Sequence, residues 1–273
     1  MSLNTVDLPY QGPSPAPDPL AHITLIHGWA AENAIWQDWA QTWLSPFCQV
    51  TLVELPGFGE TPALPNQPTP ALIDAWLTQL WQAIPSRSTL LGWSLGGLLA
   101  QRLAAKALSP NADKQVTGLI CLASTPCFEQ TQGWQHGVSP QLMQDFMQAL
   151  ARESARVVKQ FWSLQLQGST QARPLIKQLK QHLGQRHLPS FQGLQQGLVL
   201  LRALDHRHLL PQLTLPTLWL FGEKDPLIPL SVCEQIQHAQ PHAETQVIPD
   251  CGHMPFFSHP ETTAKAIQTF LLK

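Results

Sequence analysis

The chain has 273 residues, 44% of them hydrophobic and 12% charged, and its formal net charge is −2. This length suits one α/β domain with an inserted subdomain, and the charge gives no global reason to expect a nucleic-acid partner. No apolar run reaches the roughly 18 residues needed to cross a membrane.

Cysteine usage and short motifs limit the cofactors and the compartment. The five cysteines are odd in number and form no C-x-x-C pair, which argues against a disulfide framework and against a zinc site. No glycine-rich dinucleotide motif or P-loop is present, so we expect neither a metal nor an organic cofactor. The first residues lack the charged and apolar regions of a signal peptide. We therefore expect a cytoplasmic protein. We also expect it to be a monomer.

Taken in chain order, the sequence predicts alternating strands and helices after a proline-rich start. Residues 1–20 carry five prolines and are expected to form a flexible lead-in. Strands are predicted near 22–26, 49–55, 88–92, 117–123, 216–222 and 245–249. Helices are predicted near 33–45, 69–84, 95–108, 230–239 and 260–272. This alternation indicates a mostly parallel sheet flanked by helices, built from residues 21–124 and 188–273.

The strand series stops between residues 125 and 187, and this segment is predicted to be a helical lid inserted into the sheet domain. Ser139-Pro140 is a good helix start, since serine caps helices and proline suits the first turn. Leu142, Phe146 and Leu150 then recur at helical spacing. We expect the lid to cover Ser94.

The pentapeptide Gly92-Trp93-Ser94-Leu95-Gly96 matches G-x-S-x-G, the pattern of a nucleophile elbow. It stands between a predicted strand and a predicted helix, which is the context that the motif requires. The glycines allow a strained turn that exposes the serine hydroxyl above the sheet. Ser94 is therefore the candidate nucleophile.

Two loops downstream of Ser94 supply a candidate acid and a candidate base. Asp225 follows the predicted strand at 216–222, although Glu223 and Asp250 are alternative acids. His253 lies beside a glycine after the last predicted strand. Histidine would take the serine proton, and the acid would fix the imidazole tautomer.

The backbone would stabilise an oxyanion. One N–H donor is expected from Leu95, directly after the nucleophile, and the other from Trp29 in the loop that follows the first predicted strand.

The predicted lid is basic, whereas the rest of the chain is acidic. Residues 125–187 hold seven basic and three acidic side chains, a balance of +4, and the remaining nine basic and fifteen acidic side chains give −6. Two interpretations stay open. The charges could be ordinary solvated helix faces, or they could form a docking surface for an acidic partner.

Several segments together resemble the pimeloyl-[acyl-carrier protein] methyl ester esterases of biotin synthesis, members of the α/β-hydrolase fold. The resemblance runs from about residue 22 to the C-terminus. It is carried by His27-Gly28-Trp29, by Leu55-Pro56-Gly57-Phe58-Gly59, by the Gly92–Gly97 elbow, by Ala123-Ser124-Thr125-Pro126-Cys127-Phe128, by Phe161-Trp162-Ser163-Leu164-Gln165 and by Gly252-His253-Met254-Pro255-Phe256.

The resemblance implies hydrolysis of a pimeloyl methyl ester carried on acyl carrier protein, with methanol as a product. It implies carrier docking through Arg156, Arg173 and Lys177. The residues that it implies for substrate binding are Trp29, Ser94, Leu95, Phe161, Trp162, Ser163, Leu164, Gln165 and His253.

The chain departs from this family at two positions. Ala30 replaces a usual glycine, so the oxyanion loop must be shaped differently if that position needs a positive φ. Gln160 stands where a basic lid residue is expected, which would weaken docking of the carrier.

Two other functions stay open. One is a broad carboxylesterase acting on short free esters, and the other is a non-catalytic binding protein on the same fold.

Overall fold

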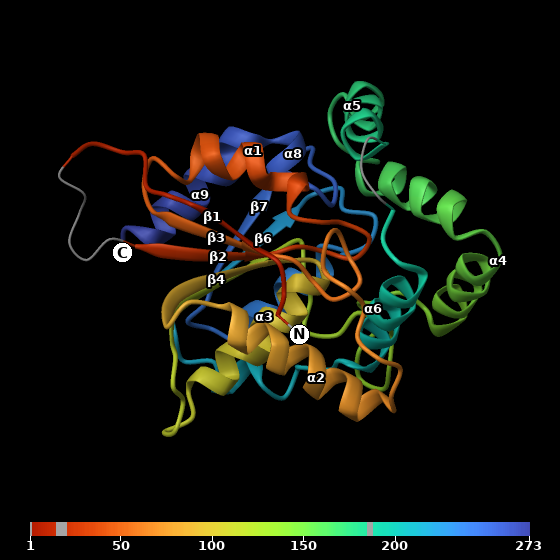
Figure 1. Cartoon of the computed structure of the whole chain (residues 1–273), viewed down its shortest axis with the longest axis horizontal. Helices are drawn as coiled ribbons and strands as arrows, with labels where there is room; N and C mark the ends of the chain where they lie inside the picture. The colour runs from red at the N-terminus through yellow and green to blue at the C-terminus, as the bar shows by residue number, and fades with distance from the viewer. Residues whose placement is uncertain (1, 15–20, 185–187) are drawn as a thin grey trace.

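In the computed structural model, residues 2–14, 21–184 and 188–273 are described, and they build a seven-stranded sheet with helices on both faces (Figure 1). The strand order is β1-β3-β2-β4-β5-β6-β7. Six of the strands run parallel: β2 (His22–Ile26), β3 (Gln49–Val53), β4 (Arg87–Trp93), β5 (Gln115–Leu122), β6 (Thr217–Gly222) and β7 (Glu244–Ile248). The predicted α/β fold with a mostly parallel sheet is confirmed.

The seventh strand corrects the prediction of a flexible start. Thr5–Leu8 forms β1, which pairs antiparallel with β3 at the sheet edge. Leu8 is buried, and the Asp7 carboxylate accepts a hydrogen bond from the Thr51 hydroxyl at 2.6 Å. A strand of four residues beside prolines is too short to show a clear alternation, and only its pairing with β3 defines it. Residues 15–20 of the predicted lead-in lie outside the described residues.

The predicted helices of the sheet domain are present with nearly the expected bounds. They are α1 (Ala34–Trp43), α2 (Thr69–Ala83), α3 (Leu95–Ala107), α7 (Ser231–Ala239) and α9 (Pro260–Leu271). The short α8 (Pro255–Ser258) and the 3-10 helix η1 (Leu210–Gln212) were not predicted. Figure 1 shows α1, α8 and α9 on one face of the sheet and α2 and α3 on the other.

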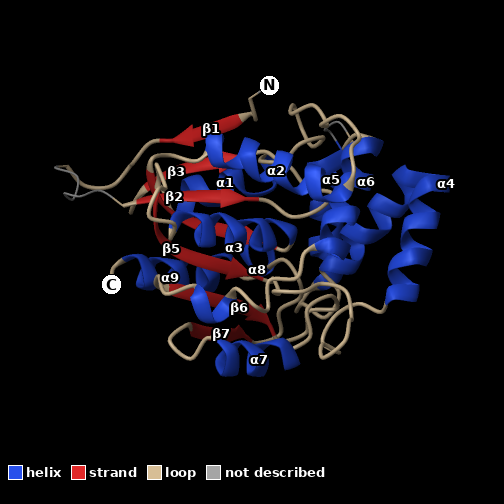
Figure 2. Cartoon of the chain, turned by 90° about the horizontal axis from the view of Figure 1, so that it is seen from below, coloured by secondary structure: helices blue, strands red, loops and turns tan. Residues whose placement is uncertain are grey.

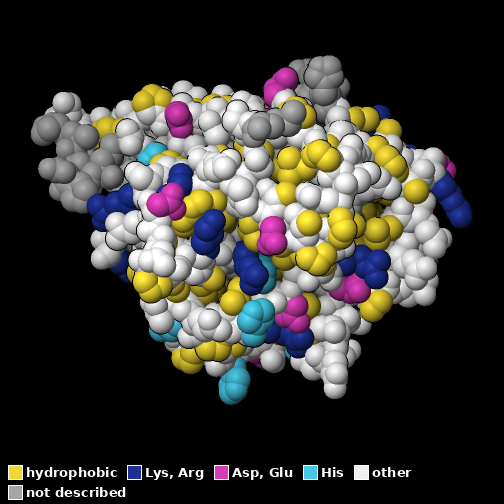
Figure 3. Space-filling view, turned by 60° about the horizontal axis from the view of Figure 1, so that its bottom comes forward, with side chains coloured by type: hydrophobic (Ala, Val, Ile, Leu, Met, Phe, Trp, Pro, Cys, Tyr) yellow, Lys and Arg dark blue, Asp and Glu magenta, His cyan; other side chains and the backbone are white. Residues whose placement is uncertain are grey.

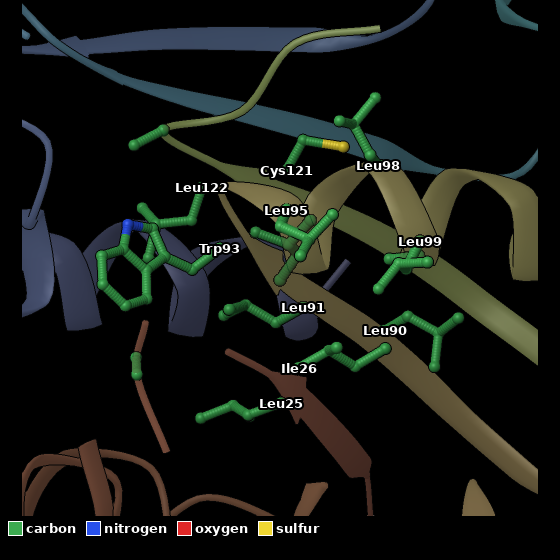
Figure 4. Close-up of a cluster of buried hydrophobic side chains, with 14 of the residues drawn as sticks. Leu25, Ile26, Leu90, Leu91, Trp93, Leu95, Leu98, Leu99, Cys121 and Leu122 are labelled. Carbon is green, nitrogen blue, oxygen red and sulfur yellow. The ribbon is translucent and has the colours of Figure 1, made fainter. Parts of the chain in front are cut away.

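The core lies where α3 packs on the central strands. Figure 4 shows leucine and isoleucine side chains from β2 and β4 beside Leu98 and Leu99 of α3, all fully buried. Burying one such side chain contributes about 1.5–3 kcal/mol. The turn between β4 and α3 is therefore fixed from both sides.

The described part of the connection from β5 to β6 holds three α-helices, which gather beyond the carboxyl ends of the parallel strands (Figure 2). They are α4 (Pro140–Gln165), α5 (Ala172–Gly184) and α6 (Phe191–Ala203). Ser139 caps α4 as predicted, since its Oγ accepts the Leu142 N–H at 3.2 Å. Helix α4 is interrupted at Glu153, whose φ of −143° and ψ of 58° are not helical.

Helix α6 was not predicted as a helix. It contains Gly193 and Gly197, which weaken helix propensity by about 1 kcal/mol each. The helix forms because its leucines are buried and it packs against α2, α3 and α4.

Candidate active site

Ser94 lies at the sharp turn between β4 and α3. Its φ of 56° and ψ of −118° are strained for a residue with a Cβ. The chain can turn here because Gly96 lets two backbone segments meet. A Cβ at Gly96 would lie 2.0 Å from the carbonyl oxygen of Ile26. The turn has the geometry of a nucleophile elbow.

Ser94, His253 and Asp225 form a hydrogen-bonded chain. The Ser94 Oγ lies 2.9 Å from His253 Nε2, and His253 Nδ1 lies 2.7 Å from the Asp225 Oδ2. A carboxylate only accepts hydrogen bonds, so Nδ1 carries the proton and Nε2 is free to accept from the serine hydroxyl. The histidine and aspartate side chains are 0% and 1% exposed, which keeps water away from this chain.

Backbone groups hold the acid and the base in place. The Asp225 Oδ1 accepts the N–H groups of Leu227 and Ile228 at 2.8 and 3.0 Å. The carbonyl oxygen of His253 accepts from the Trp93 indole N–H at 2.8 Å.

The alternative acids have other partners. The Glu223 carboxylate accepts the Asp250 N–H at 2.9 Å, and the Asp250 carboxylate forms an ion pair with Lys224. The structure therefore brings Asp225, rather than Glu223 or Asp250, to the imidazole.

The predicted oxyanion donors lie at the start of α3 and in the loop after β2, and both are close to Ser94. Leu95 is the first residue of α3, and Trp29 follows Gly28, where a Cβ would lie 3.1 Å from the Ser94 Cβ. Within the described part of the chain, neither the Trp29 N–H nor the Leu95 N–H donates to a protein acceptor. Both donors are therefore available to a bound oxyanion.

Ala30 adopts a φ of 60°, so this position does take the left-handed conformation. The alanine therefore carries the strain that a glycine would avoid. The Ala30 carbonyl accepts the Trp162 indole N–H at 2.8 Å, which ties the loop to α4.

His27 fixes the start of the same loop. Its Nε2 accepts the Leu55 N–H at 3.0 Å, so Nδ1 carries the proton and donates to the Gly28 carbonyl at 2.8 Å. Burial lowers the pKa of His27 to about 4. The imidazole is therefore neutral near pH 7.

A cavity of about 250 Å³ opens at Ser94, between the sheet domain and the helices α4 and α6. Apart from Ser94 its lining is apolar: Trp29, Phe128, Val138, Leu142, Met143, Phe146, Phe161, Leu164, Leu198, Leu201, Pro226 and Leu227. The Trp29 indole N–H is engaged with the Leu194 carbonyl at 2.9 Å. The cavity therefore suits an aliphatic chain. No group of three or more His, Cys, Asp or Glu in the described ranges is arranged to hold a metal ion.

Comparison with known proteins places this geometry in a family. The α/β hydrolase fold family matches residues 21–260. A curated "Pimeloyl-[acyl-carrier protein] methyl ester esterase" of Pectobacterium atrosepticum is 35% identical, over 91% of this chain and 93% of its own length. One of Vibrio vulnificus is 34% identical, over 97% of this chain and 98% of its own length. This chain belongs to the pimeloyl-[acyl-carrier protein] methyl ester esterase family of α/β-hydrolases.

Solved structures agree with the fold of this esterase family. An esterase from Exiguobacterium antarcticum superposes with a TM-score of 0.82 at 20% identity, covering 99% of this chain and 96% of that chain.

The structure brings only some of the predicted substrate-binding residues of the esterase family to the cavity. Trp29, Ser94, Phe161 and Leu164 line it. His253 and Leu95 are not among the lining residues: His253 contacts the Ser94 Oγ through Nε2, and the Leu95 side chain lies against Gly197 in α6.

Three residues of the predicted segment do not line the cavity. The Trp162 indole faces the oxyanion loop, as described above. The Ser163 hydroxyl donates to the Lys159 carbonyl at 3.0 Å, and the Gln165 carbonyl accepts the His253 N–H at 2.8 Å. Consecutive helical residues point in different directions, so an uninterrupted run of five cannot all face one cavity.

Sequence reasoning missed most of the lining contributed by other segments. Leu142 and Phe146 carried a helical spacing that could have placed them on the inner face of the lid. Leu198 and Leu201 lie on the unpredicted α6, and Pro226 and Leu227 follow the acid in its loop.

The predicted docking residues are exposed. Arg156, Arg173 and Lys177 lie on the outer surface of α4 and α5, and Gln160 is exposed beside them. Arg156 forms a surface ion pair with Glu153 at 3.0 Å. Arg186, which contributes to the basic balance of the lid, lies outside the described residues. On the face shown in Figure 3, Lys and Arg are interspersed with Asp and Glu.

Proposed function

We propose that this protein hydrolyses the methyl ester of a pimeloyl chain carried on acyl carrier protein, releasing methanol. The observation that supports this most strongly is a hydrogen-bonded Ser94–His253–Asp225 chain at an apolar cavity, in a protein 34–35% identical to esterases named for that substrate. The product would be a carrier-linked pimeloyl group for biotin synthesis.

Ser94 would act as the nucleophile. Its Oγ attacks the ester carbonyl carbon while His253 Nε2 takes the hydroxyl proton. The imidazolium then gives this proton to the leaving methoxide, and methanol departs. A water molecule attacks the acyl-serine by the same route in reverse and regenerates the Ser94 hydroxyl.

Asp225 and two backbone amides would stabilise the charges that develop. The Asp225 carboxylate stabilises the imidazolium through the 2.7 Å contact with Nδ1. The N–H groups of Trp29 and Leu95 would donate to the tetrahedral oxyanion. Losing one such donor costs about 2.7–4 kcal/mol of barrier.

The cavity would select an aliphatic acyl chain. Each methylene that it buries contributes about 0.8 kcal/mol. Its lining offers no charged side chain to neutralise a carboxylate, so the neutral methyl ester is a better ligand than the free acid.

Carrier docking would use the exposed basic residues Arg156, Arg173 and Lys177. The net positive charge of the lid would steer an acidic carrier toward the cavity, mostly by raising the association rate. Gln160 would make carrier docking weaker than a further basic side chain at that position would.

The five cysteines of the structure are unpaired, which fits a reducing cytoplasm.

The test measures methanol release from the pimeloyl methyl ester on acyl carrier protein and on free pantetheine. Wild type is compared with Ser94→Ala and with a lid variant in which Arg156, Arg173 and Lys177 become alanine. We expect the carrier-linked ester to be preferred. The lid variant should lose this preference but keep its activity on the pantetheine ester.

A second triple variant controls for net charge. Arg87, Lys265 and Lys273 lie far from the lid in the sequence and are exposed, and changing them to alanine should leave the preference intact. Equal rates on both esters, unaffected by the lid variant, would identify a broad carboxylesterase. Equal rates for wild type and Ser94→Ala would identify a non-catalytic protein.

A further inference from the structure

The C-terminal end of α4 contacts the loop that carries His253. The Gln165 carbonyl, at the last residue of the helix, accepts the His253 N–H at 2.8 Å. The same end of α4 supplies Phe161 and Leu164 to the cavity. One helix end therefore lines the cavity and holds the backbone of the proposed base.

The contact continues through the segment that follows α4. The Ser169 Oγ accepts the Gly252 N–H at 2.8 Å, and Ser169 is 7% exposed. Gly252 leaves no space between the two segments. A Cβ there would lie 2.8 Å from the carbonyl oxygens of Gln165 and Gln167.

The same segment also contacts the loop that carries Asp225 and the residues that precede His253. The Thr170 N–H donates to the Asp250 carbonyl at 3.0 Å. A Cβ at Gly168 would lie 2.6 Å from the Lys224 carbonyl oxygen, in the residue directly before Asp225. Residues 165–170 thus bind to the loops of both proposed partners of Ser94.

We propose that Ser169 is a positioning residue for His253. The Ser169 hydroxyl holds the peptide between Cys251 and Gly252, one peptide before the His253 N–H, and the Trp93 indole holds the His253 carbonyl. Of the contacts that residues 165–170 make with Gly252 and His253, the Ser169 bond is the one made by a side chain. It can therefore be removed without altering the backbone of either segment.

The chemistry explains why this bond matters. The imidazole must meet Ser94 at 2.9 Å and Asp225 at 2.7 Å at once, which leaves little freedom for the backbone that carries it. Without the Ser169 hydroxyl, the Gly252 N–H loses its acceptor, and the peptide can rotate toward water. A displacement of 1 Å at a reacting group costs roughly 10²-fold in rate, so a smaller shift should cost about tenfold.

This inference rests on the proposed ester hydrolysis, and its test includes a measurement that does not depend on activity. Ser169→Ala and Ser169→Thr are compared with wild type. The rate readout is kcat on p-nitrophenyl acetate, a small ester that needs no carrier. The structural readout is the downfield proton NMR signal of the His253 Nδ1–H, together with the pH profile of kcat.

Ser88→Ala is the matched control. The Ser88 hydroxyl is buried and bonds to the Thr24 hydroxyl at 2.9 Å, near the amino end of β4. Ser94 follows the opposite, carboxyl end of β4, so loss of this bond should lower stability without displacing His253.

We expect Ser169→Ala to lower kcat about tenfold with little change in KM, and to shift or broaden the Nδ1–H signal. Ser169→Thr should restore most of the rate, and Ser88→Ala should keep the wild-type signal and rate. A wild-type kcat and signal in Ser169→Ala would overturn the proposal. So would an equal loss in Ser88→Ala, because the loss would then reflect stability alone.

Failure of the proposed function is distinguishable from failure of this inference. If wild type and Ser94→Ala hydrolyse esters equally, the function is wrong, whereas the NMR signal still reports whether Ser169 positions the imidazole.

Discussion

Ser94 and Ala30 both hold positive φ angles although each carries a Cβ. At Ser94 the strain exposes the hydroxyl above the sheet. At Ala30 it turns the loop so that the preceding Trp29 can present its N–H to the same site. Each residue is kept in this conformation by its surroundings, which for Ala30 include the 2.8 Å bond from Trp162.

Replacing Ala30 tests the strain directly. The left-handed conformation costs an L-residue roughly 1–2 kcal/mol, and glycine loses about 0.5–1 kcal/mol more on folding than alanine does. Ala30→Gly should therefore leave the melting temperature equal or slightly raised and keep the esterase rate. Ala30→Val adds a branched Cβ at positive φ and should lower both. Thermal unfolding and kcat check this, and a clearly destabilised glycine variant would contradict it.

The choice of acid is also decided at single residues. Asp225→Asn should lower kcat by about 10⁴-fold, since an amide favours the wrong imidazole tautomer. Asp250→Asn is the matched change in the alternative acid, and it removes only an exposed ion pair, which contributes little to stability. Its kcat should stay near wild type. Similar losses in both variants would place the acid elsewhere.

At the scale of elements, α6 holds the loop that contains Trp29. Gly197 of α6 faces Trp29, and the Leu194 carbonyl binds the Trp29 indole. The sequence did not predict this helix, because its two glycines weaken the helical pattern that its leucines make. The helix forms because neighbouring helices bury those leucines.

Gly197→Ala should disturb this packing. The new Cβ would lie 2.6 Å from Trp29 Cδ1, so the indole or the helix must move. Because Trp29 would supply an oxyanion donor, we expect kcat to fall about tenfold or more. Gln195→Ala on the exposed face of α6 is the control and should be silent. An unchanged rate in Gly197→Ala would show that the loop is held independently of α6.

At the scale of the whole molecule, two buried histidines link stability to pH. Burial lowers the pKa of His27 to about 4, and burial, with the Arg102 charge second, lowers that of His206 to about 3. Both groups bind fewer protons when folded than when unfolded, where the pKa is about 6.5. Their contribution to stability is therefore fully present above pH 6.5 and is lost as the pH falls toward 4 and 3.

His206 offers a clean test, because neither ring nitrogen has a hydrogen-bond partner among the described residues. Between pH 6.5 and 5 each histidine should cost about 2 kcal/mol of unfolding free energy. His206→Leu should be at least as stable as wild type at pH 7.5 and should lose roughly half as much on acidification. Urea unfolding of wild type and His206→Leu at pH 7.5 and pH 5 measures this. The same loss of unfolding free energy in both proteins would contradict it.

The helices in the described part of the chain include none long and apolar enough to cross a membrane.

Local patterns in the sequence were enough to determine the six parallel strands, the elbow at Ser94 and the candidates Asp225 and His253. Each depends on residues that are close in the chain: an apolar strand, a glycine turn, a polar loop. Tertiary structure decided the rest. It chose Asp225 over Glu223 and Asp250, formed β1 and α6 from weak patterns, and directed Phe161 but not Ser163 into the cavity. These outcomes depend on packing between segments far apart in the chain, which no local pattern encodes.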